Sequence, residues 1–259
     1  MNPIPHAHSS SLGLIAAAVL SAVSAFYIAA GVRSSRRCKR WPLSRYFCWM
    51  CGAVCAAAAV TGPLPRQAHA DFTAHMFVHL LLGMIAPLLL ALAAPLTLAL
   101  RTLPAAASRK LVRLLKSTPL RIAGNPFAAS LLNVGGLWVL YTTDLYAVMQ
   151  HSALLHGFVH LHLLLAGYLF TVSMIANEPA APRTGFVYRA IMFWLALAGH
   201  GILAKRLYAF PPPGVPAAQA EAGGMLMYYG GDAVELAIFA IFCRQWFHAS
   251  RPRVSSASG

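Results

Sequence analysis

The chain alternates long apolar runs with short polar segments. An apolar run of about 20 residues is long enough to cross the hydrocarbon core of a bilayer as a helix. Runs of roughly this length occur at residues 11–32, 46–62, 72–100, 125–146, 153–176, 187–208 and 223–243. The polar connections between them are too short to form a separate soluble domain. The pattern therefore predicts an all-α, polytopic membrane protein whose one domain is a bundle of seven transmembrane helices.

The third run is the longest, and it contains Pro87 and Pro95. Proline removes a backbone donor and kinks a helix. Membrane helices tolerate such kinks where neighbouring groups satisfy the freed backbone atoms. We therefore expect a bent helix here that is packed closely by its neighbours.

Basic residues are distributed unevenly among the polar segments. Of the 20 Lys and Arg residues, all but Arg66, Lys205 and Arg206 fall on one side of the predicted bundle. Segments rich in Lys and Arg stay in the cytoplasm, so the amino terminus is expected outside and the carboxy terminus inside. The chain then divides into an outer tail (1–10), the bundle (11–243) and a cytoplasmic tail (244–259). Because a signal peptide begins with basic residues and this tail has none, the first run is expected to be a retained span.

Composition supports this class. Hydrophobic residues make up 59% of the chain and charged residues 10%, whereas soluble domains carry about 25% charged residues. The net charge of +14 would suggest a nucleic-acid partner in a soluble protein, but the loops account for it, so no nucleic acid is expected. We expect the lipid bilayer of the bacterial cytoplasmic (inner) membrane. The sequence lacks a GxSxG elbow, a phosphate loop and a dinucleotide fingerprint, so we expect no enzyme.

Ten of the eleven histidines lie on the predicted outer side. His75 and His79 are four residues apart on one predicted helix, and His156 and His160 are four apart on another. Residues at this spacing share a helix face, so two imidazoles can coordinate one metal ion. With His200 at a similar depth, the two pairs predict a shared metal or haem site in the outer half of the membrane.

Three other histidines are expected to play different roles. His162 is off the face of the second pair by helical phase, and we expect it to pack or to form a hydrogen bond. His69 and His151 are expected to be surface residues, with recruitment of metal as the alternative.

Methionines accompany the histidines. Met76 follows His75, while Met225 and Met227 begin the last run. Thioether with imidazole favours copper, and Cu(I) over Cu(II), whereas zinc more usually takes carboxylate or thiolate with histidine. We expect one of these methionines to complete the site, although methionine is also common packing material in membrane helices.

Two acids fall inside the last run, where ionisable groups are expensive and are functional candidates. Asp232 is expected to orient a ligand histidine from behind or to pair with Lys205 or Arg206. The sequence leaves the role of Glu235 open.

Cysteines form a further pattern. Cys48, Cys51 and Cys55 fall on one helix face. We expect small apolar thiols there, with a Cu(I)–thiolate site as the alternative.

Several of these residues occur in the motifs of a known family. The motifs are His75-Met76-Phe77-Val78-His79, Pro87, Pro95-Leu96, Arg101-Thr102-Leu103-Pro104, Trp138 ahead of His156 and His160, Gly199-His200, and Gln219 ahead of Gly223-Gly224-Met225-Leu226-Met227. Over roughly residues 40–247 the sequence resembles the seven-span CtaG family of membrane proteins, which assist cytochrome c oxidase assembly. It departs from that family at Tyr141-Thr142-Thr143, where many members carry His-x-Pro, and at Val159, where many carry Glu.

The resemblance implies a copper-binding assembly factor that delivers copper to a haem-copper oxidase, especially to its copper B centre. The implied partners are oxidase subunit I or another copper chaperone. Alternatives stay open: a b-type haem protein in electron transfer, since such proteins also ligate haem with histidines on separate spans, a copper transport or resistance protein, and a scaffold whose histidines serve packing. The sequence does not fix the oxidase served, the metal stoichiometry or the oligomeric state.

Overall fold

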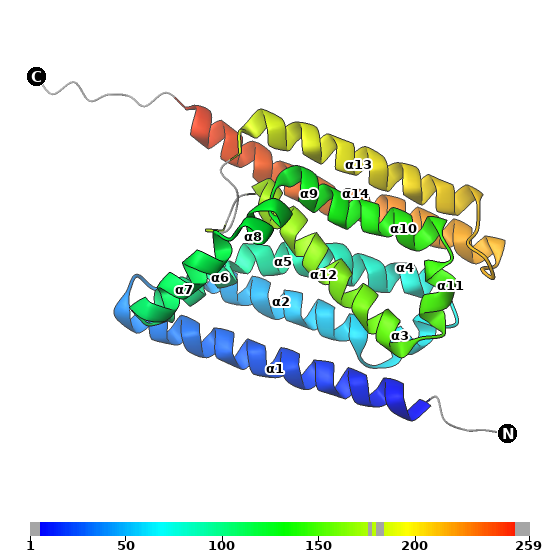
Figure 1. Ribbon diagram of the computed structural model, residues 1–259, viewed down its shortest axis with the longest axis horizontal. Helices are drawn as coiled ribbons and strands as arrows, with labels where there is room; N and C mark the ends of the chain where they lie inside the picture. Colours follow the sequence, from blue (N-terminus) through cyan, green and yellow to red (C-terminus); the bar gives the residue numbers. More distant parts are fainter. Residues whose placement is uncertain (1–5, 176–177, 180–183, 252–259) are drawn as a thin grey trace, which may run out of the picture.

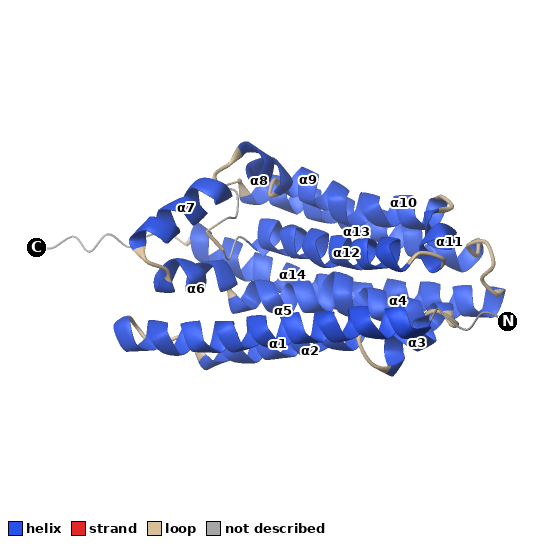
Figure 2. Cartoon of the chain, turned by 60° about the horizontal axis from the view of Figure 1, so that its bottom comes forward, coloured by secondary structure: helices blue, strands red, loops and turns tan. Residues whose placement is uncertain are grey.

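The computed structural model describes residues 6–175, 178–179 and 184–251 of the chain. All regular elements in these residues are helices, and no strand occurs among them. The long helices run alternately in opposite directions and pack side by side (Figure 1). A second view shows the same helices in stacked layers (Figure 2). The predicted all-α class is confirmed.

Long helices alternate with short ones along the chain. Their bounds are α1 His6–Arg37, α2 Leu43–Val60, α3 Pro63–Ala68, α4 Phe72–Leu80, η1 Leu81–Ile85, α5 Ala86–Ala93, α6 Pro95–Thr102, α7 Ala105–Leu115, α8 Thr118–Ala123, α9 Pro126–Ser130, η2 Leu131–Gly135, α10 Gly136–Thr142, α11 Leu145–Gln150, α12 Ala153–Ile175, α13 Phe186–Ala209 and α14 Ala217–Ser250. The elements η1 and η2 are single π-helical turns inside longer helices, a feature that is frequent at functional sites.

Within the described residues, six helices are long and apolar enough to span a membrane. They are Ile15–Arg36, Leu43–Val60, Phe72–Thr102, Ala153–Ile175, Phe186–Ala209 and Ala217–Ser250. These helices confirm a multi-pass membrane protein. The two that carry the histidine pairs, Phe72–Thr102 and Ala153–Ile175, are also the most enclosed, with 61% of the apolar stretch buried in each.

The segment predicted as a span at 125–146 is shorter than expected. Its continuous apolar helix covers Pro126–Thr142, which is about 25 Å at 1.5 Å per residue, against roughly 30 Å of hydrocarbon. The helix ends there because Thr143 is extended and its hydroxyl bonds to the Val139 carbonyl. A full seventh span therefore stays a prediction.

The bundle has two chemically different ends. We call the end where α4 and α12 begin the histidine end, and the end where α1 and α14 finish the basic end (Figure 1). The described basic residues before α2, within α6–α8 and at the close of α14 all lie towards the basic end. The histidine pairs lie at the other. That the histidine end faces outward stays a prediction from the charge distribution.

The last helix is longer than the predicted span at 223–243. It begins at Ala217 and continues to Ser250, so the first residues of the predicted cytoplasmic tail are helical. Residues 1–5 of the predicted outer tail and 252–259 of the cytoplasmic tail lie outside the described residues.

The central helix α4–η1–α5 is bent where proline predicted it. The π-helical turn η1 precedes Pro87, and the chain breaks at Ala94, whose left-handed conformation (φ 54°) separates α5 from α6. Neighbours pack closely at the bend: a Cβ on Gly167 of α12 would overlap the carbonyl oxygen of Gly83. Glycine there lets α12 approach the central helix.

A carboxylate from a distant segment caps the helix that begins after this break. Glu178 is buried, and its oxygens accept hydrogen bonds from the backbone N–H of Leu96 (3.1 Å) and Thr97 (3.0 Å) and from the Thr97 hydroxyl (3.0 Å). These N–H groups lie in the first turn of α6 and have no partner within the helix. Burial raises the pKa of Glu178, and its bonds to Thr97 and Leu96 oppose that shift. Glu178 thus caps the second half of a broken membrane helix.

We predict that Glu178→Ala lowers the free energy of unfolding by on the order of 3 kcal/mol, because the two backbone N–H groups and the Thr97 hydroxyl lose their acceptor. Glu178→Gln keeps one side-chain oxygen as acceptor and should lose less. Thermal unfolding of the detergent-solubilised protein measures both. Glu221→Ala, which removes an exposed acid, is the control. Equal melting temperatures for all three variants would refute the capping role.

Candidate functional site

The start of α4 fixes the depth of the first histidine pair. Asp71 caps the helix by accepting from the Thr73 N–H (2.8 Å), and Gln219 of α14 accepts from the Phe72 N–H (3.0 Å). These bonds satisfy donors that a helix start leaves open. His75 and His79 therefore lie one and two turns inside, and each is only 3% exposed.

His75 is enclosed by aromatic side chains. Its Nε2 lies 3.0 Å from the Tyr141 hydroxyl of α10, and the Phe72 and Tyr146 rings pack around it. The other ring nitrogen, Nδ1, is buried without a hydrogen-bond partner in the described chain. When Tyr141 accepts from Nε2–H, Nδ1 carries the lone pair that a metal ion needs.

The second pair lies on α12 beside the first. The rings of His156 and His160 are 4.2 Å apart between centroids, and α12 packs against η1, the turn that follows His79. The Nδ1 atoms of His79 and His156 are also buried and unpartnered in the part of the chain that is described. The structure thus brings the four predicted histidines into one region of the bundle.

The four rings do not yet form a closed site. Among the described residues, no three His, Cys, Asp or Glu side chains converge closely enough to hold a metal ion. The predicted ligand set of His75, His79, His156 and His160 is therefore clustered but not preassembled. Binding would require some of these rings to turn about their side-chain torsions.

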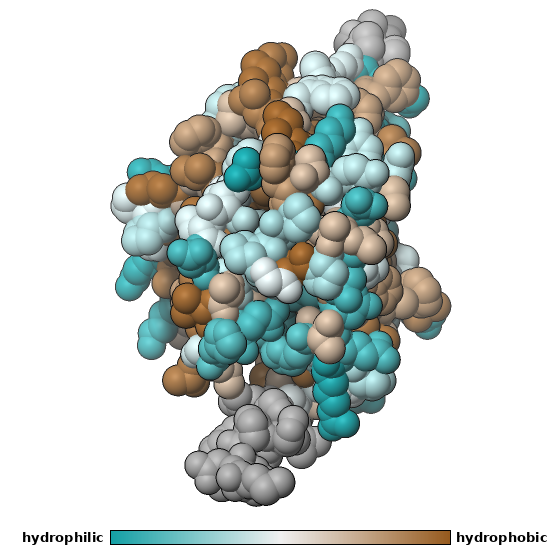
Figure 3. All heavy atoms as spheres, turned by 90° about the vertical axis from the view of Figure 1, so that its right-hand side faces the viewer, coloured by the Kyte–Doolittle hydropathy of each residue, from teal (hydrophilic) through white to brown (hydrophobic). Residues whose placement is uncertain are grey.

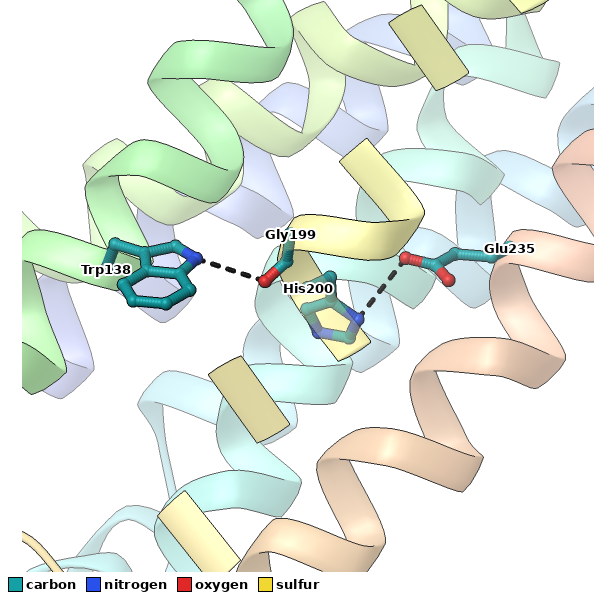
Figure 4. A network of polar contacts seen from close by, with 4 residues as sticks. All are labelled: Trp138, Gly199, His200 and Glu235. Carbon is teal, nitrogen blue, oxygen red and sulfur yellow. Dashed lines mark hydrogen bonds and ion pairs between the residues drawn. The ribbon is translucent and has the colours of Figure 1, made fainter. Parts of the chain in front are cut away.

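His200 occupies a separate polar position deeper in the bundle. Its Nδ1 is 3.3 Å from a carboxylate oxygen of Glu235 on α14, and both side chains are buried. Trp138 of α10 donates to the Gly199 carbonyl (3.0 Å) and so fixes the turn of α13 that carries His200 (Figure 4). The Nε2 of His200 is buried without a partner in the described residues.

A small cavity joins this position to the first histidine pair. It has a volume of about 20 Å³, and its lining includes His79, His200, Glu235, Asn133 and Thr171. A cavity of this size that several polar groups line in part has room for one water molecule. Turns of both π-helical segments, η1 and η2, contribute to the lining. His200 and His79 thus line one cavity, and a metal site shared between them stays a prediction.

The three predicted methionines differ in position. Met76 and Met227 are buried in one core cluster with Phe72, whereas Met225 is 47% exposed. Met76 also packs against Gly223, where a Cβ would come within 3.1 Å of its side chain. Of the three, Met76 and Met227 are therefore the buried ones, and a ligand role for either stays a prediction.

The orienting carboxylate is Glu235 instead of Asp232. Asp232 is exposed because it lies roughly 100° around α14 from the buried Gly231, whereas Glu235 is one turn beyond Gly231 on the same face. The predicted cations Lys205 and Arg206 lie over the rings of Tyr228 and Phe210. The prediction for Asp232 as the residue behind a ligand histidine was therefore wrong.

The remaining histidines and cysteines follow their predictions more closely. His162 forms a hydrogen bond with the Leu132 carbonyl (3.1 Å), as its helical phase indicated. His69 and His151 are exposed. Cys48, Cys51 and Cys55 are free and partly buried on α2; metal binding by these thiols stays untested.

Comparison with known proteins identifies the family. Residues 25–249 match the family described as cytochrome c oxidase caa3 assembly factor (Caa3_CtaG). The chain belongs to this family. The match extends the resemblance seen in the sequence, and it includes the histidine pairs, His200 and Glu235. Caa3_CtaG proteins are described as assembly factors for cytochrome c oxidase of the caa3 type.

Relatives of this Caa3_CtaG chain occur in mycobacteria. An uncharacterized protein of Mycobacterium leprae is 30% identical over 67% of the chain and 28% of its own length. Uncharacterized proteins of Mycobacterium bovis and Mycobacterium tuberculosis are each 31% identical over 71% of the chain and 29% of their own length. The chain thus spans less than a third of these curated relatives. No solved structure gives a significant match.

We predict that Glu235→Ala lowers the free energy of unfolding by about 1–3 kcal/mol, because it removes the carboxylate that lies 3.3 Å from the buried His200 Nδ1. Asp232→Ala, on an exposed position of the same helix, should change it by less than about 0.5 kcal/mol. Denaturant titration in detergent compares the two variants. Equal effects would contradict the assignment of Glu235.

Proposed function

We propose that this Caa3_CtaG protein binds copper in the membrane and delivers it to the copper centre of a haem-copper oxidase, acting as an assembly factor and not as an enzyme. Copper is the cargo. The receiver would be oxidase subunit I or another copper chaperone, and the setting would be the bacterial inner membrane with the histidine end outward. The family description supports the assembly role, and the copper chemistry is argued from the residues.

The observation that carries the proposal is a set of unpaired buried nitrogens. His75 Nδ1, His79 Nδ1, His156 Nδ1 and His200 Nε2 have no partner among the described residues. Leaving a buried polar atom unpaired costs about 1–3 kcal/mol. Native proteins rarely accept this cost unless a water molecule or an ion binds the atom. A cation that takes imidazole ligands would satisfy several of these atoms together.

The surrounding atoms favour copper over harder ions. Imidazole and thioether are soft or borderline ligands that suit copper, and Met76 and Met227 are buried in one core cluster with Phe72. Oxygen-loving ions such as Mg²⁺ or Ca²⁺ would need several carboxylates or carbonyls. Metal binding also requires neutral imidazoles, which a buried apolar setting favours.

The local charge favours Cu(I) over Cu(II). Among the described residues, the buried carboxylates are those of Glu178 and Glu235. Glu178 caps α6 towards the basic end, so only Glu235 lies near the histidines. A site of neutral histidines and thioethers cannot cancel the charge of its ion. The cost of burying an uncompensated charge rises steeply with that charge. A monovalent ion, with Glu235 nearby, is therefore the easier cargo.

On this proposal the copper ion leaves laterally, between helices and within the plane of the membrane. The face of α12 opposite His156 and His160 exposes Leu154, Phe158 and Leu161. This apolar surface would contact lipid or a partner subunit. His160 is thus on the opposite face of the same helix from the surface against which an oxidase subunit would pack.

We predict that a double His79→Ala and His160→Ala variant, purified after loading with Cu(I) under reducing conditions, retains less than half of the copper held by the unmodified protein. Removing one imidazole from each helix leaves too few ligands for a shared ion. Elemental analysis measures copper per chain. His248→Ala, at the basic end, is the control and should bind as the unmodified protein does.

Two outcomes of this experiment would overturn the proposal. Unchanged copper stoichiometry in the double variant would exclude the histidine pairs as ligands. A Soret band in the protein as purified would favour the alternative of a b-type haem protein.

A further inference from the structure

We propose that His69 is a capture ligand, which takes the cation from water at the histidine end and passes it to His156 and then His160. This inference rests on the proposed copper function. It assigns a role to an exposed histidine that lies outside the buried cluster, and it gives the cluster a route from the surface.

The turn between α3 and α4 holds His69 in place. The backbone N–H groups of Ala70 and Asp71 both donate to the Gln67 carbonyl, which closes a tight turn around His69. The residue is exposed at the histidine end. Figure 3 looks onto this end and shows hydrophilic side chains gathered across the middle of the face, with hydrophobic ones towards its sides. A hydrated ion can therefore approach His69 from water.

A glutamine from another helix orients the imidazole. His69 Nδ1 lies 3.2 Å from the Oε1 atom of Gln150, the last residue of α11. An amide oxygen only accepts hydrogen bonds, so Nδ1 carries the proton and Nε2 carries the lone pair. Such a bond behind a histidine fixes its tautomer and makes it a better metal ligand. His69 therefore presents Nε2 as a ready ligand atom.

Three rings follow one another inward from this point. The centroids of His69 and His156 are 4.8 Å apart, and those of His156 and His160 are 4.2 Å apart. Exposure falls along the series, from exposed His69 through half-buried His156 to His160 at 8%. The unpartnered Nδ1 of His156 lies in the middle of the series.

This spacing permits transfer by ligand exchange. The ion binds a new imidazole before it leaves the previous one, so it is never stripped of all ligands in an apolar setting, where a bare charge is very costly. No covalent bond in the protein changes, and the ion keeps its oxidation state. The deeper pair on α4 then receives the ion from α12.

We predict that His69→Ala slows the loading of Cu(I) by on the order of tenfold, the scale on which oriented ligands affect metal sites, and leaves the final copper content unchanged. The full-length protein in detergent is mixed with Cu(I) held by a coloured chelator and kept reduced with ascorbate. The decay of the chelator absorbance gives the rate, and elemental analysis gives the final content.

Two further variants sharpen the test. His151→Ala removes an exposed histidine one residue beyond Gln150 and should load at the unmodified rate. Gln150→Ala removes the bond behind His69 and should slow loading less than His69→Ala does.

Each failure has a different meaning. If His69→Ala loads as fast as the unmodified protein, the capture role is wrong while the proposed function stands. If it lowers the final copper content, His69 is a resident ligand and the capture role is again wrong. If the unmodified protein takes up no copper, the proposed function itself fails and the capture role fails with it.

Discussion

Apolar helices packed in a hydrocarbon layer have no water to bond a buried donor or acceptor, so the protein must supply every partner itself. This constraint organises the described structure. Glu178 reaches across a break to the open N–H groups of α6, and Tyr141 and Glu235 each face one nitrogen of a buried histidine. Among the buried side-chain atoms that have no partner in the described residues, imidazole nitrogens are the most numerous, and they gather in one part of the bundle.

The geometry of that part depends on departures from regular helix. The π-helical turns η1 and η2 widen two helices beside the histidines, and residues of both line the small cavity between His79 and His200. Gly83 and Gly167 permit close contact between the central helix and α12 on the same level. A straight central helix would present His75 and His79 differently to α12. The bend, the glycines and the polar cavity are thus parts of one local arrangement.

The sequence predicted the features that depend on the length and period of apolar runs. It did not predict features that depend on how individual side chains bond and pack. Apolar run lengths located the long helices, and i,i+4 spacing placed each histidine pair on one face. The early end of the helix at Thr142 depends on hydroxyl bonds to the preceding turn, which run length does not record. Glu235 and Asp232 are both acids in one apolar run, and only the packed face of α14 tells them apart. The partner of His75 was hidden because Tyr141 is 66 positions away.

The polar groups next to the histidines differ in strength as acceptors, and the strongest of them lies beside the deepest histidine. At the surface, the amide oxygen of Gln150 lies beside the His69 ring. Further in, the phenol of Tyr141 lies beside His75, and deepest of all the carboxylate of Glu235 lies beside His200. A more basic acceptor behind an imidazole raises its strength as a ligand. On the proposed function, the carboxylate of Glu235 would therefore make His200 the strongest ligand of the three. The same carboxylate would also offset the charge of the ion where water is least available.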